Sequence, residues 1–362
     1  MSLTVASPSR PRRGGFSLLE ATAGGHRRTV LAGLVITLIG FAILSLFVGA
    51  QALPPAQVFG AIVGADVPTE VALLVLELRV PRTILGILVG VCLGVAGTLM
   101  QALTRNPLAE PGILGVNAGA SAAVVTGVAL TSVGGVAFAG VTATVVSVVF
   151  AFVGAAAASV LVLLLGGAFR SGTDPVRLTL AGAALSIVLG AYTNAILLNF
   201  PTIFQSFKHW AVGSLQGRGY DVILPIAAIA VPAALAACLC GPWLNALALG
   251  TEMGRALGAN PRRLGLIGGV LVVLLAGSAT AAAGPIAFVG LAAPLAVRAL
   301  VGPDYRWVLP LSALSAAIIV VGADMIGRVL MNPAEVETAV IASLIGAPVF
   351  IALVRRRRWA RL

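Results

Sequence analysis

Long apolar runs separated by short polar turns make up almost the whole of this chain. Each run has about the length of one membrane-spanning helix, which needs roughly 20 apolar residues. The limits of the ten runs are 29–50, 83–104, 112–131, 137–168, 178–200, 222–243, 264–283, 286–301, 307–328 and 338–354. The pattern predicts an all-α polytopic integral membrane protein. We expect one transmembrane domain over 29–354, with basic tails at 1–28 and 355–362.

Composition excludes the main structural alternative, a soluble protein with long buried helices. Hydrophobic residues make up 59% of the chain and charged residues only 10%. Too few polar residues remain to cover a soluble surface, where about a quarter of all residues are charged. The first run also resembles a signal peptide, with Ala50-Gln51-Ala52 as a cleavage site. Its core is longer than the 7–15 residues of signal peptides, so we interpret it as the first spanning helix.

The basic residues are distributed unequally between the two sides that ten spans would create. The tails and alternate loops hold 18 of them, and the other side holds five, namely Arg79, Arg82, Lys208, Arg218 and Arg328. Cytoplasmic loops carry the excess of basic residues in membrane proteins. The asymmetry therefore predicts that both termini lie in the cytoplasm. Because the positive charge is confined to tails and short loops, the net charge of +11 does not indicate nucleic-acid binding.

Several kinds of chemistry are poorly represented. The single lysine, Lys208, lies outside any phosphate-binding motif of the G-x-x-x-x-G-K-[ST] type, so any ATP must bind to another subunit. Two histidines offer little for metal binding or acid–base catalysis. Asp324 is the one carboxylate inside an apolar run, and Arg328 follows one turn later to pair with it. This argues against a self-contained proton-coupled carrier, which places ionisable groups at membrane depth.

The segment from Arg79 to Ser121 has the features of a transport path. Arg79 and Arg82 precede a small-residue helix, and a rigid polar turn then leads into the next helix. Glycines three or four residues apart form a stripe on the first of these helices, which suits either close helix packing or a smooth path lining. Our candidate residues for the path and its turn are Gly94, Gly97, Gln101, Asn106, Pro107, Glu110, Pro111 and Gly115.

The longest inner loop, about 244–263, contains a short helical pattern that ends in Gly258 and a Pro-Arg-Arg sequence. A short polar helix parallel to the membrane could contact a cytoplasmic partner, and a glycine would let the chain reverse at its end. An ordinary amphipathic connector remains the alternative. The candidate contact residues are Gly250, Glu252, Arg255, Ala256, Leu257 and Gly258.

Four motifs occur together in one order along the chain. They are RVPR at 79–82, RNPLAEPGILG at 105–115, ALGTEMGRALGANPRRL ending at Leu264, and GPIAFVGLAAP at 284–294. Together they resemble the FecCD-type permeases, which are the membrane subunits of bacterial ABC importers for ferric siderophores, haem and cobalamin. Two positions depart from the family's pattern. Leu295 replaces a frequent histidine, and Glu337 replaces a frequent proline.

The resemblance implies a BtuC-like fold and several partners. These are two ABC ATPase subunits, an extracytoplasmic substrate-binding protein and a second permease subunit, all in or at the cytoplasmic membrane. It implies that residues 250–263 couple to the ATPases and that Arg79, Arg82 and Arg328 dock the binding protein. No cofactor is expected in this chain, since ATP and magnesium belong to the ATPase. The cargo would be a bulky metal chelate, most often a ferric siderophore, with haem and cobalamin as alternatives. A self-contained carrier or channel is the alternative of another class.

Overall fold

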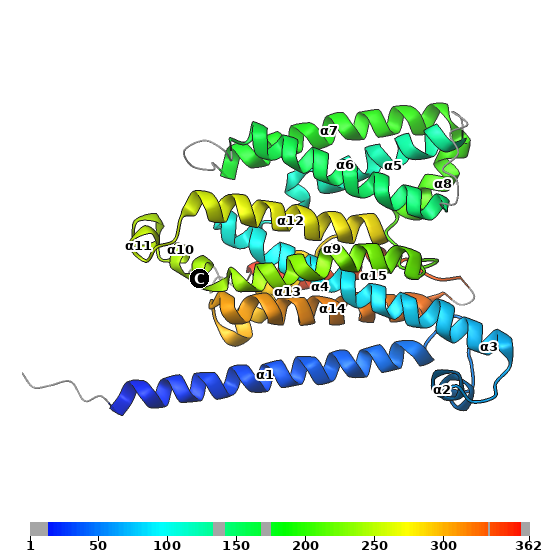
Figure 1. Ribbon diagram of the computed structural model, residues 1–362, viewed down its shortest axis with the longest axis horizontal. Helices are drawn as coiled ribbons and strands as arrows, with labels where there is room; N and C mark the ends of the chain where they lie inside the picture. The colour runs from blue at the N-terminus through cyan, green and yellow to red at the C-terminus, as the bar shows by residue number, and fades with distance from the viewer. Residues whose placement is uncertain (1–13, 133–141, 168–174, 332–333, 356–362) are drawn as a thin grey trace, which may run out of the picture.

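Helices make up nearly all of the structure, a computed structural model that describes residues 14–132, 142–167, 175–331 and 334–355 (Figure 1). Short turns connect them, and the described residues include a single isolated β-bridge between Met331 and Ala334. The elements are α1 (Gly14–Phe47), α2 (Pro55–Val63), α3 (Thr69–Leu73), the π-helical turn η1 (Leu74–Arg79), α4 (Val80–Thr104), the 3-10 turn η2 (Pro111–Leu114), α5 (Val116–Ser132), α6 (Ala143–Leu165), α7 (Pro175–Asn199), α8 (Pro201–Ala211), α9 (Tyr220–Leu239), α10 (Gly241–Ala248), α11 (Thr251–Ala256), α12 (Pro261–Ala283), α13 (Val289–Val301), α14 (Tyr305–Leu330) and α15 (Thr338–Arg355).

Each of the ten predicted spans contains a helix, which confirms the all-α membrane fold. In the described part of the chain, seven helices are long and apolar enough to cross a membrane. Three shorter apolar helices, at 116–131, 289–301 and 338–352, occupy the remaining predicted spans. The first part of the predicted span 137–168, up to residue 141, lies outside the described residues. The helix of this span, α6, begins at Ala143.

Two boundaries differ from the prediction. Residues 14–28, which we expected in the basic N-terminal tail, belong to α1, while 1–13 and 356–362 lie outside the described residues. The second span begins 14 residues before the predicted Thr83, because α3 and η1 lead without interruption into α4. Pro81 lies in the first turn of α4, where a missing N–H is tolerated. The apolar pattern predicted the position of the span correctly. It did not predict where the helix starts, because Arg79 and Arg82 interrupt the apolar run.

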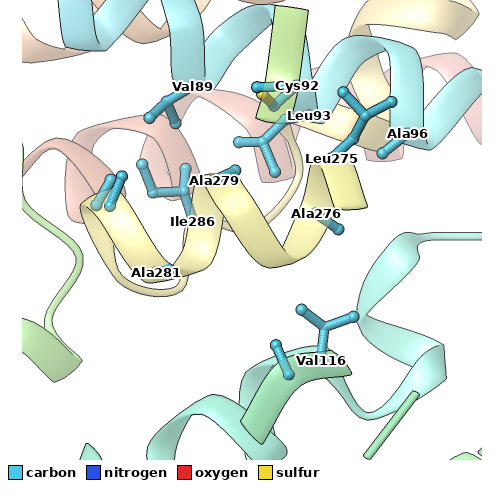
Figure 2. Close-up of a cluster of buried hydrophobic side chains, with 14 of the residues drawn as sticks. Val89, Cys92, Leu93, Ala96, Val116, Leu275, Ala276, Ala279, Ala281 and Ile286 are labelled. Atoms are coloured by element: carbon cyan, nitrogen blue, oxygen red, sulfur yellow. The ribbon is translucent and has the colours of Figure 1, made fainter. Parts of the chain in front are cut away.

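The core of the molecule is centred on α4. This helix packs against α14, α12, α13 and α9, and most of its residues are buried. In Figure 2, Val89, Cys92, Leu93 and Ala96 of α4 lie beside Leu275, Ala276 and Ala279 of α12. By contrast, α1 and α7 lie on opposite sides of the molecule and expose most of their apolar residues (Figure 1). The central helices are therefore packed on protein and the outer ones present apolar surface, as expected in lipid.

Short helices mark the two ends of the molecule. The start of α1 and the pair α10–α11 lie at one end, and α2, α3 and α8 lie at the other (Figure 1). The first end carries the predicted inner loop. The second carries the connections between the first and second predicted spans and between the fifth and sixth. We use inner end and outer end for these two ends from here on.

One helix, α13, is too short to cross a bilayer alone. Its 13 residues correspond to about 20 Å of helix, against roughly 30 Å of hydrocarbon. The chain reaches it through a non-helical segment between Ala283 and Val289. Phe288 at its N-cap has φ +64°, which is uncommon for a residue other than glycine.

Candidate functional site

The predicted docking arginines form a cluster at the outer end with two carboxylates. We call Arg79, Arg82, Arg328, Asp324 and Glu335 the outer arginine cluster. Asp324 is only 1% exposed and accepts hydrogen bonds from Arg82 Nε at 3.0 Å and Nη2 at 2.8 Å. It also pairs closely with Arg328 on the next turn of α14, which was the alternative interpretation of Arg328. The buried carboxylate of Asp324 therefore forms ion pairs with two guanidinium groups.

Arg79 and Arg328 donate hydrogen bonds to backbone carbonyls at and just beyond the C-terminal end of α1. The last carbonyls of a helix lack intrahelical partners, and cations are favourable there. Both arginines are buried, at 5% and 2% exposure. Arg79 donates to the carbonyls of Leu46, Phe47 and Gln51 at 2.6–3.2 Å, and Arg328 donates to those of Ser45 and Val48 at 2.8 and 3.0 Å. These two arginines thus hold α1 to α4 and α14.

Arg82 is the most accessible arginine of the cluster. Its Nη1 donates to Glu335 at 2.6 Å, and the side chains of the two residues are 12% and 19% exposed. Glu335 lies between α14 and α15. The cluster contains three cations and two carboxylates, so it retains one uncompensated positive charge. A carboxylate from outside the chain would complement that charge.

The glycines proposed for the path instead lie in tight helix contacts. A Cβ built on Gly94 would lie 2.3 Å from the carbonyl oxygen of Ser312 in α14. A Cβ on Gly97 would lie 1.8 Å from that of Gly290 in α13. Gln101 is also buried, and its amide lies 3.5 Å from the carbonyl of Leu291. The geometry favours the packing interpretation of the glycine stripe.

The polar turn after α4 divides into an exposed and a buried part. Asn106 and Pro107 are exposed, and Asn106 Oδ1 accepts from Leu108 N at 2.9 Å. Glu110 turns inward, and its Oε1 accepts from Phe288 N at 3.3 Å. Pro111 is buried beside it. Gly115 adopts φ +73° between η2 and α5, where a side chain would be strained. The turn therefore joins α4 and α5 to the start of α13.

The predicted inner contact region contains a six-residue helix, α11, as expected for 250–263. Gly250 precedes it with φ +108°, and Gly258 follows it with φ +82°. The N–H of Ala259 donates to Gly254 O at 2.9 Å, which closes the turn at the helix end. Most of the helix is accessible, and its exposed positions in or beside α11 are Glu252, Met253, Arg255, Ala256 and Leu257.

A polar junction behind α11 was missed by sequence reasoning. Asp304 caps the start of α14 and accepts from Asn245 Nδ2 at 2.6 Å. Asn245 Oδ1 in turn accepts from Tyr305 N at 2.8 Å, and Arg27 pairs with Asp304 at 3.1 Å. Arg105 Nη2 reaches Leu247 O at 3.3 Å. The junction fixes α10 to α1, α4 and α14. An Asp before a helix signals a cap, but no sequence signal indicates its partner 59 residues away.

Two sizeable cavities lie toward the outer half of the molecule. The first, about 690 Å³, is mainly apolar and runs along α15, with Ala339, Ser343, Leu344 and Ala347 in its wall. The second, about 600 Å³, is more polar and lies between α5, α6 and the segment 214–218. Neither contains the predicted path residues.

Comparison with known proteins shows which family the chain resembles. A profile of the FecCD transport family matches residues 36–356. The ferric enterobactin transport system permease protein FepD of Escherichia coli (strain K12) is 43% identical over 337 residues, covering 91% of this chain and 96% of FepD. The hemin transport system permease protein HmuU of Yersinia pestis is 34% identical, covering 79% of this chain and 84% of HmuU.

A solved structure has the same fold. It is described as a metal-chelate type ABC transporter in an inward-facing conformation. Its sequence is 26% identical, the TM-score is 0.76, and the match covers 91% of this chain and 99% of that one. The helix order, the motifs and the profile match over nearly the full length agree, and the chain belongs to the FecCD transport family.

Proposed function

We propose that this chain is the permease subunit of a bacterial ABC importer that carries a ferric siderophore across the cytoplasmic membrane. The observation that carries the proposal is the 43% identity to a ferric enterobactin permease over 91% of the chain. A probable siderophore permease, YfiZ of Bacillus subtilis (strain 168), is 36% identical over 90% of the chain. ATP and magnesium bind to a separate ATPase, because the sequence has no Walker A motif.

Haem import is the second candidate, because the hemin permease HmuU is 34% identical. Cobalamin import stays the third possibility within the family. A deletion strain that lacks this chain separates them, by measuring the uptake of labelled ferric enterobactin, haem and cobalamin with and without the chain restored. We expect restoration of ferric enterobactin uptake. Restoration of haem or cobalamin uptake alone would overturn the siderophore assignment, and restoration of none would overturn the import function.

The inner end contacts the two ATPase subunits in this proposal. Met253 and Leu257 are more than half exposed and lie one helical turn apart, with Glu252 and Arg255 beside them. An apolar pair with a charged border is a typical centre for a protein contact. The polar junction at Asp304 would transmit motion of α10–α11 to α14. This orientation places both termini in the cytoplasm, in agreement with the charge asymmetry.

The outer end receives the substrate-binding protein. The surplus positive charge of the outer arginine cluster supports this role, and Arg82 is its best-placed contact because Arg79 and Arg328 are buried on α1. A carboxylate of the binding protein would replace Glu335 on Arg82. Arg82→Glu should weaken capture of the binding protein at low salt, and acidic-to-basic changes on the partner should partly restore it. Lys208→Glu reverses an exposed charge at the same end and serves as the control. Unchanged capture by the Arg82 variant would show that docking occurs elsewhere.

A second permease subunit completes the path, as a copy of this chain or a similar one. The apolar cavity along α15 is open on the single chain, which agrees with a path shared between two subunits. Chemical cross-linking of single cysteines along the exposed face of α15, at Leu344 for example, tests this arrangement. Absence of any α15–α15 or α15–paralogue product in the active importer would contradict it.

A further inference from the structure

The short helix α2 presents an apolar face that points away from the protein. Its sequence, PAQVFGAIV, includes no charged side chain. Phe59 is 60% exposed, Val63 is 58% exposed and Ile62 is 43% exposed, and Pro55 and Ala56 are exposed beside them. With 3.6 residues per turn, these five positions cover about a third of the helix circumference. We call them the apolar face of α2. Exposed apolar surfaces of this kind mark contacts with another protein or with a membrane.

The opposite side of α2 fixes the helix at the outer end of α1. Val58 and Ala61 are buried in a small cluster with Val75 of η1, and Leu46 and Phe47 of α1 pack against this cluster. Figure 1 shows α2 beside the outer end of α1. The membrane span of α1 is Gly25–Phe47, so α2 packs on its final turn. A helix of 23 residues measures about 35 Å, slightly more than the roughly 30 Å of hydrocarbon. The contact therefore places α2 at the boundary between membrane and water.

The helix that carries α2 faces lipid along most of its length. Only 6% of the most apolar window of α1 is buried, the lowest share among the seven long spans. Ile39, Ile43 and Leu44, in the outer half of α1, are all exposed apolar residues. The bilayer that covers them extends to the end of the span, where α2 is attached. Lipid at the apolar face of α2 would thus be continuous with the lipid around α1.

The charges around α2 do not suit the partners proposed for other parts of the molecule. The binding protein would present carboxylates to Arg82, but the charged residues near α2 are themselves acidic. Asp66 follows the helix, Glu70 lies in α3 and Glu77 lies in η1, and all three are exposed. Like charges across an interface are unfavourable. The second permease subunit is expected along α15, whereas α2 packs on α1, α3 and η1. Acyl chains, by contrast, need only an uncharged apolar surface.

We propose that α2 is an interfacial helix, whose apolar face enters the outer leaflet of the bilayer. The inference rests on the membrane fold and goes beyond the proposed import function. Interfacial helices bury their apolar face about 5–10 Å into the boundary between headgroups and acyl chains. Many also carry basic residues that attract anionic lipids, but α2 has none. Its membrane contact should therefore depend on apolar burial and not on lipid charge.

Membrane contact by α2 would also steady the outer arginine cluster. The segment between α1 and α2 includes Gln51, whose carbonyl accepts from Arg79 Nη2 at 2.6 Å. Gly49 in the same segment lies so close to Arg79 that a Cβ there would be 2.7 Å from Nη2. With α1 in the bilayer on one side and α2 in the interface on the other, this segment is held at both ends. Its carbonyls would stay at a fixed depth beside the arginine.

A polarity-sensitive dye on single cysteines measures the membrane contact. The permease–ATPase complex, with its three native cysteines replaced, is placed in phosphatidylcholine nanodiscs, and the dye NBD is attached to Phe59→Cys, Ile62→Cys or Asp66→Cys. We expect the dye at the first two positions to emit at shorter wavelength than at the third. Nitroxide-labelled acyl chains should quench it there, and iodide should quench it several-fold less than at Asp66→Cys. Added phosphatidylglycerol or high salt should leave these readings unchanged.

A matched pair of variants tests whether the apolar face itself makes the contact. Phe59→Glu places a charge in the middle of that face, so the dye at Ile62→Cys should become as accessible to iodide as the dye at Asp66→Cys. Gln57→Glu adds the same charge on the opposite side of α2, where the residue is half-buried, and should leave the dye at Ile62→Cys shielded.

The single-cysteine readings decide the proposal even if a charged variant fails to fold. Equal quenching by iodide at Phe59→Cys and Asp66→Cys would show that the face lies in water and would overturn the proposal. Shielding from iodide without quenching by nitroxide lipids, or shielding that appears only after the binding protein is added, would make a protein the occupant and would also overturn it. The readings involve no uptake, so failure of the import function would not change them.

Discussion

Asp324 is the residue that holds the outer end of the molecule together. Its carboxylate pairs with Arg82 and Arg328, and it accepts a further hydrogen bond from a third partner, the hydroxyl of Thr338, at 2.8 Å. Removing one partner of a buried ion pair leaves an uncompensated buried charge, which is strongly destabilising. We expect Asp324→Asn to lower the free energy of unfolding by about 3 kcal/mol. The thermal unfolding midpoint of the detergent-purified protein measures this effect.

Glu335→Gln is the matched control for that variant. Glu335 pairs with the same Arg82 but is more exposed, so we expect a loss below about 1 kcal/mol. Equal midpoints for the two variants would contradict the central role of Asp324. The Asp324–Arg328 pair was foreseeable from a spacing of four residues. The ion pair between Asp324 and Arg82 joins residues 242 positions apart in the sequence. It depends on the packing of α4 against α14, so no local sequence pattern indicates it.

At the scale of elements, the contact between α4 and α13 depends on the absence of a side chain at Gly97. A methyl group there would lie 1.8 Å from Gly290 O, so the two helices would have to separate. Gly97→Ala should therefore lower the unfolding midpoint, by an overpacking cost of about 1–3 kcal/mol. Gly33→Ala in α1 meets nothing within 4 Å and should leave the midpoint unchanged or slightly raised, because alanine favours helix. Similar losses in both variants would mean that helix propensity, and not close packing, explains the stripe.

The end of α11 gives a second prediction at this scale. Gly258 has φ +82°, a conformation that a β-branched residue adopts only with strain. Gly258→Val should impair chelate uptake and the stimulation of ATP hydrolysis, while capture of the binding protein survives. Gly64→Val introduces the same strain at φ +74° in open space at the outer end, and it should leave the stimulation of ATP hydrolysis unchanged. Normal uptake and stimulation in the Gly258 variant would argue against a coupling role for α11.

Element positions were predictable and element ends were not. Apolar runs located all ten spans, because each needs enough apolar length to cross a bilayer. The start of the second span was missed because Arg79 and Arg82 look like a solvent boundary, although both are largely buried in ion pairs and carbonyl contacts. The short helices α2, α3, α8 and α10 lie in segments whose apolar content is too brief to distinguish helix from loop.

At the scale of the whole molecule, the basic residues predict its orientation in the membrane. The test uses a variant without Cys92, Cys238 and Cys240, the only cysteines of the chain. A single cysteine at the exposed Asp66 should react with an impermeant reagent from outside, and one at the exposed Glu252 only after the membrane is opened. Labelling of the Glu252 variant from outside would reverse the orientation. The two-sided arrangement is a prediction from the sequence alone. The polar cavity beside Arg218 joins segments from five separate regions of the chain, and only the fold reveals it.

The short helix α13 has a consequence for how the protein enters the membrane during synthesis. A segment of 13 residues that contains Pro294 and Arg298 is a poor substrate for independent insertion by the translocation machinery. Its start also lacks a regular helical cap, and the N–H of Phe288 finds its acceptor on Glu110, 178 positions earlier. Such backbone groups cannot face lipid unpaired. We therefore expect α13 to wait at the insertion site until α14 emerges, and to enter the bilayer with it as a hairpin against the already assembled α4 and η2.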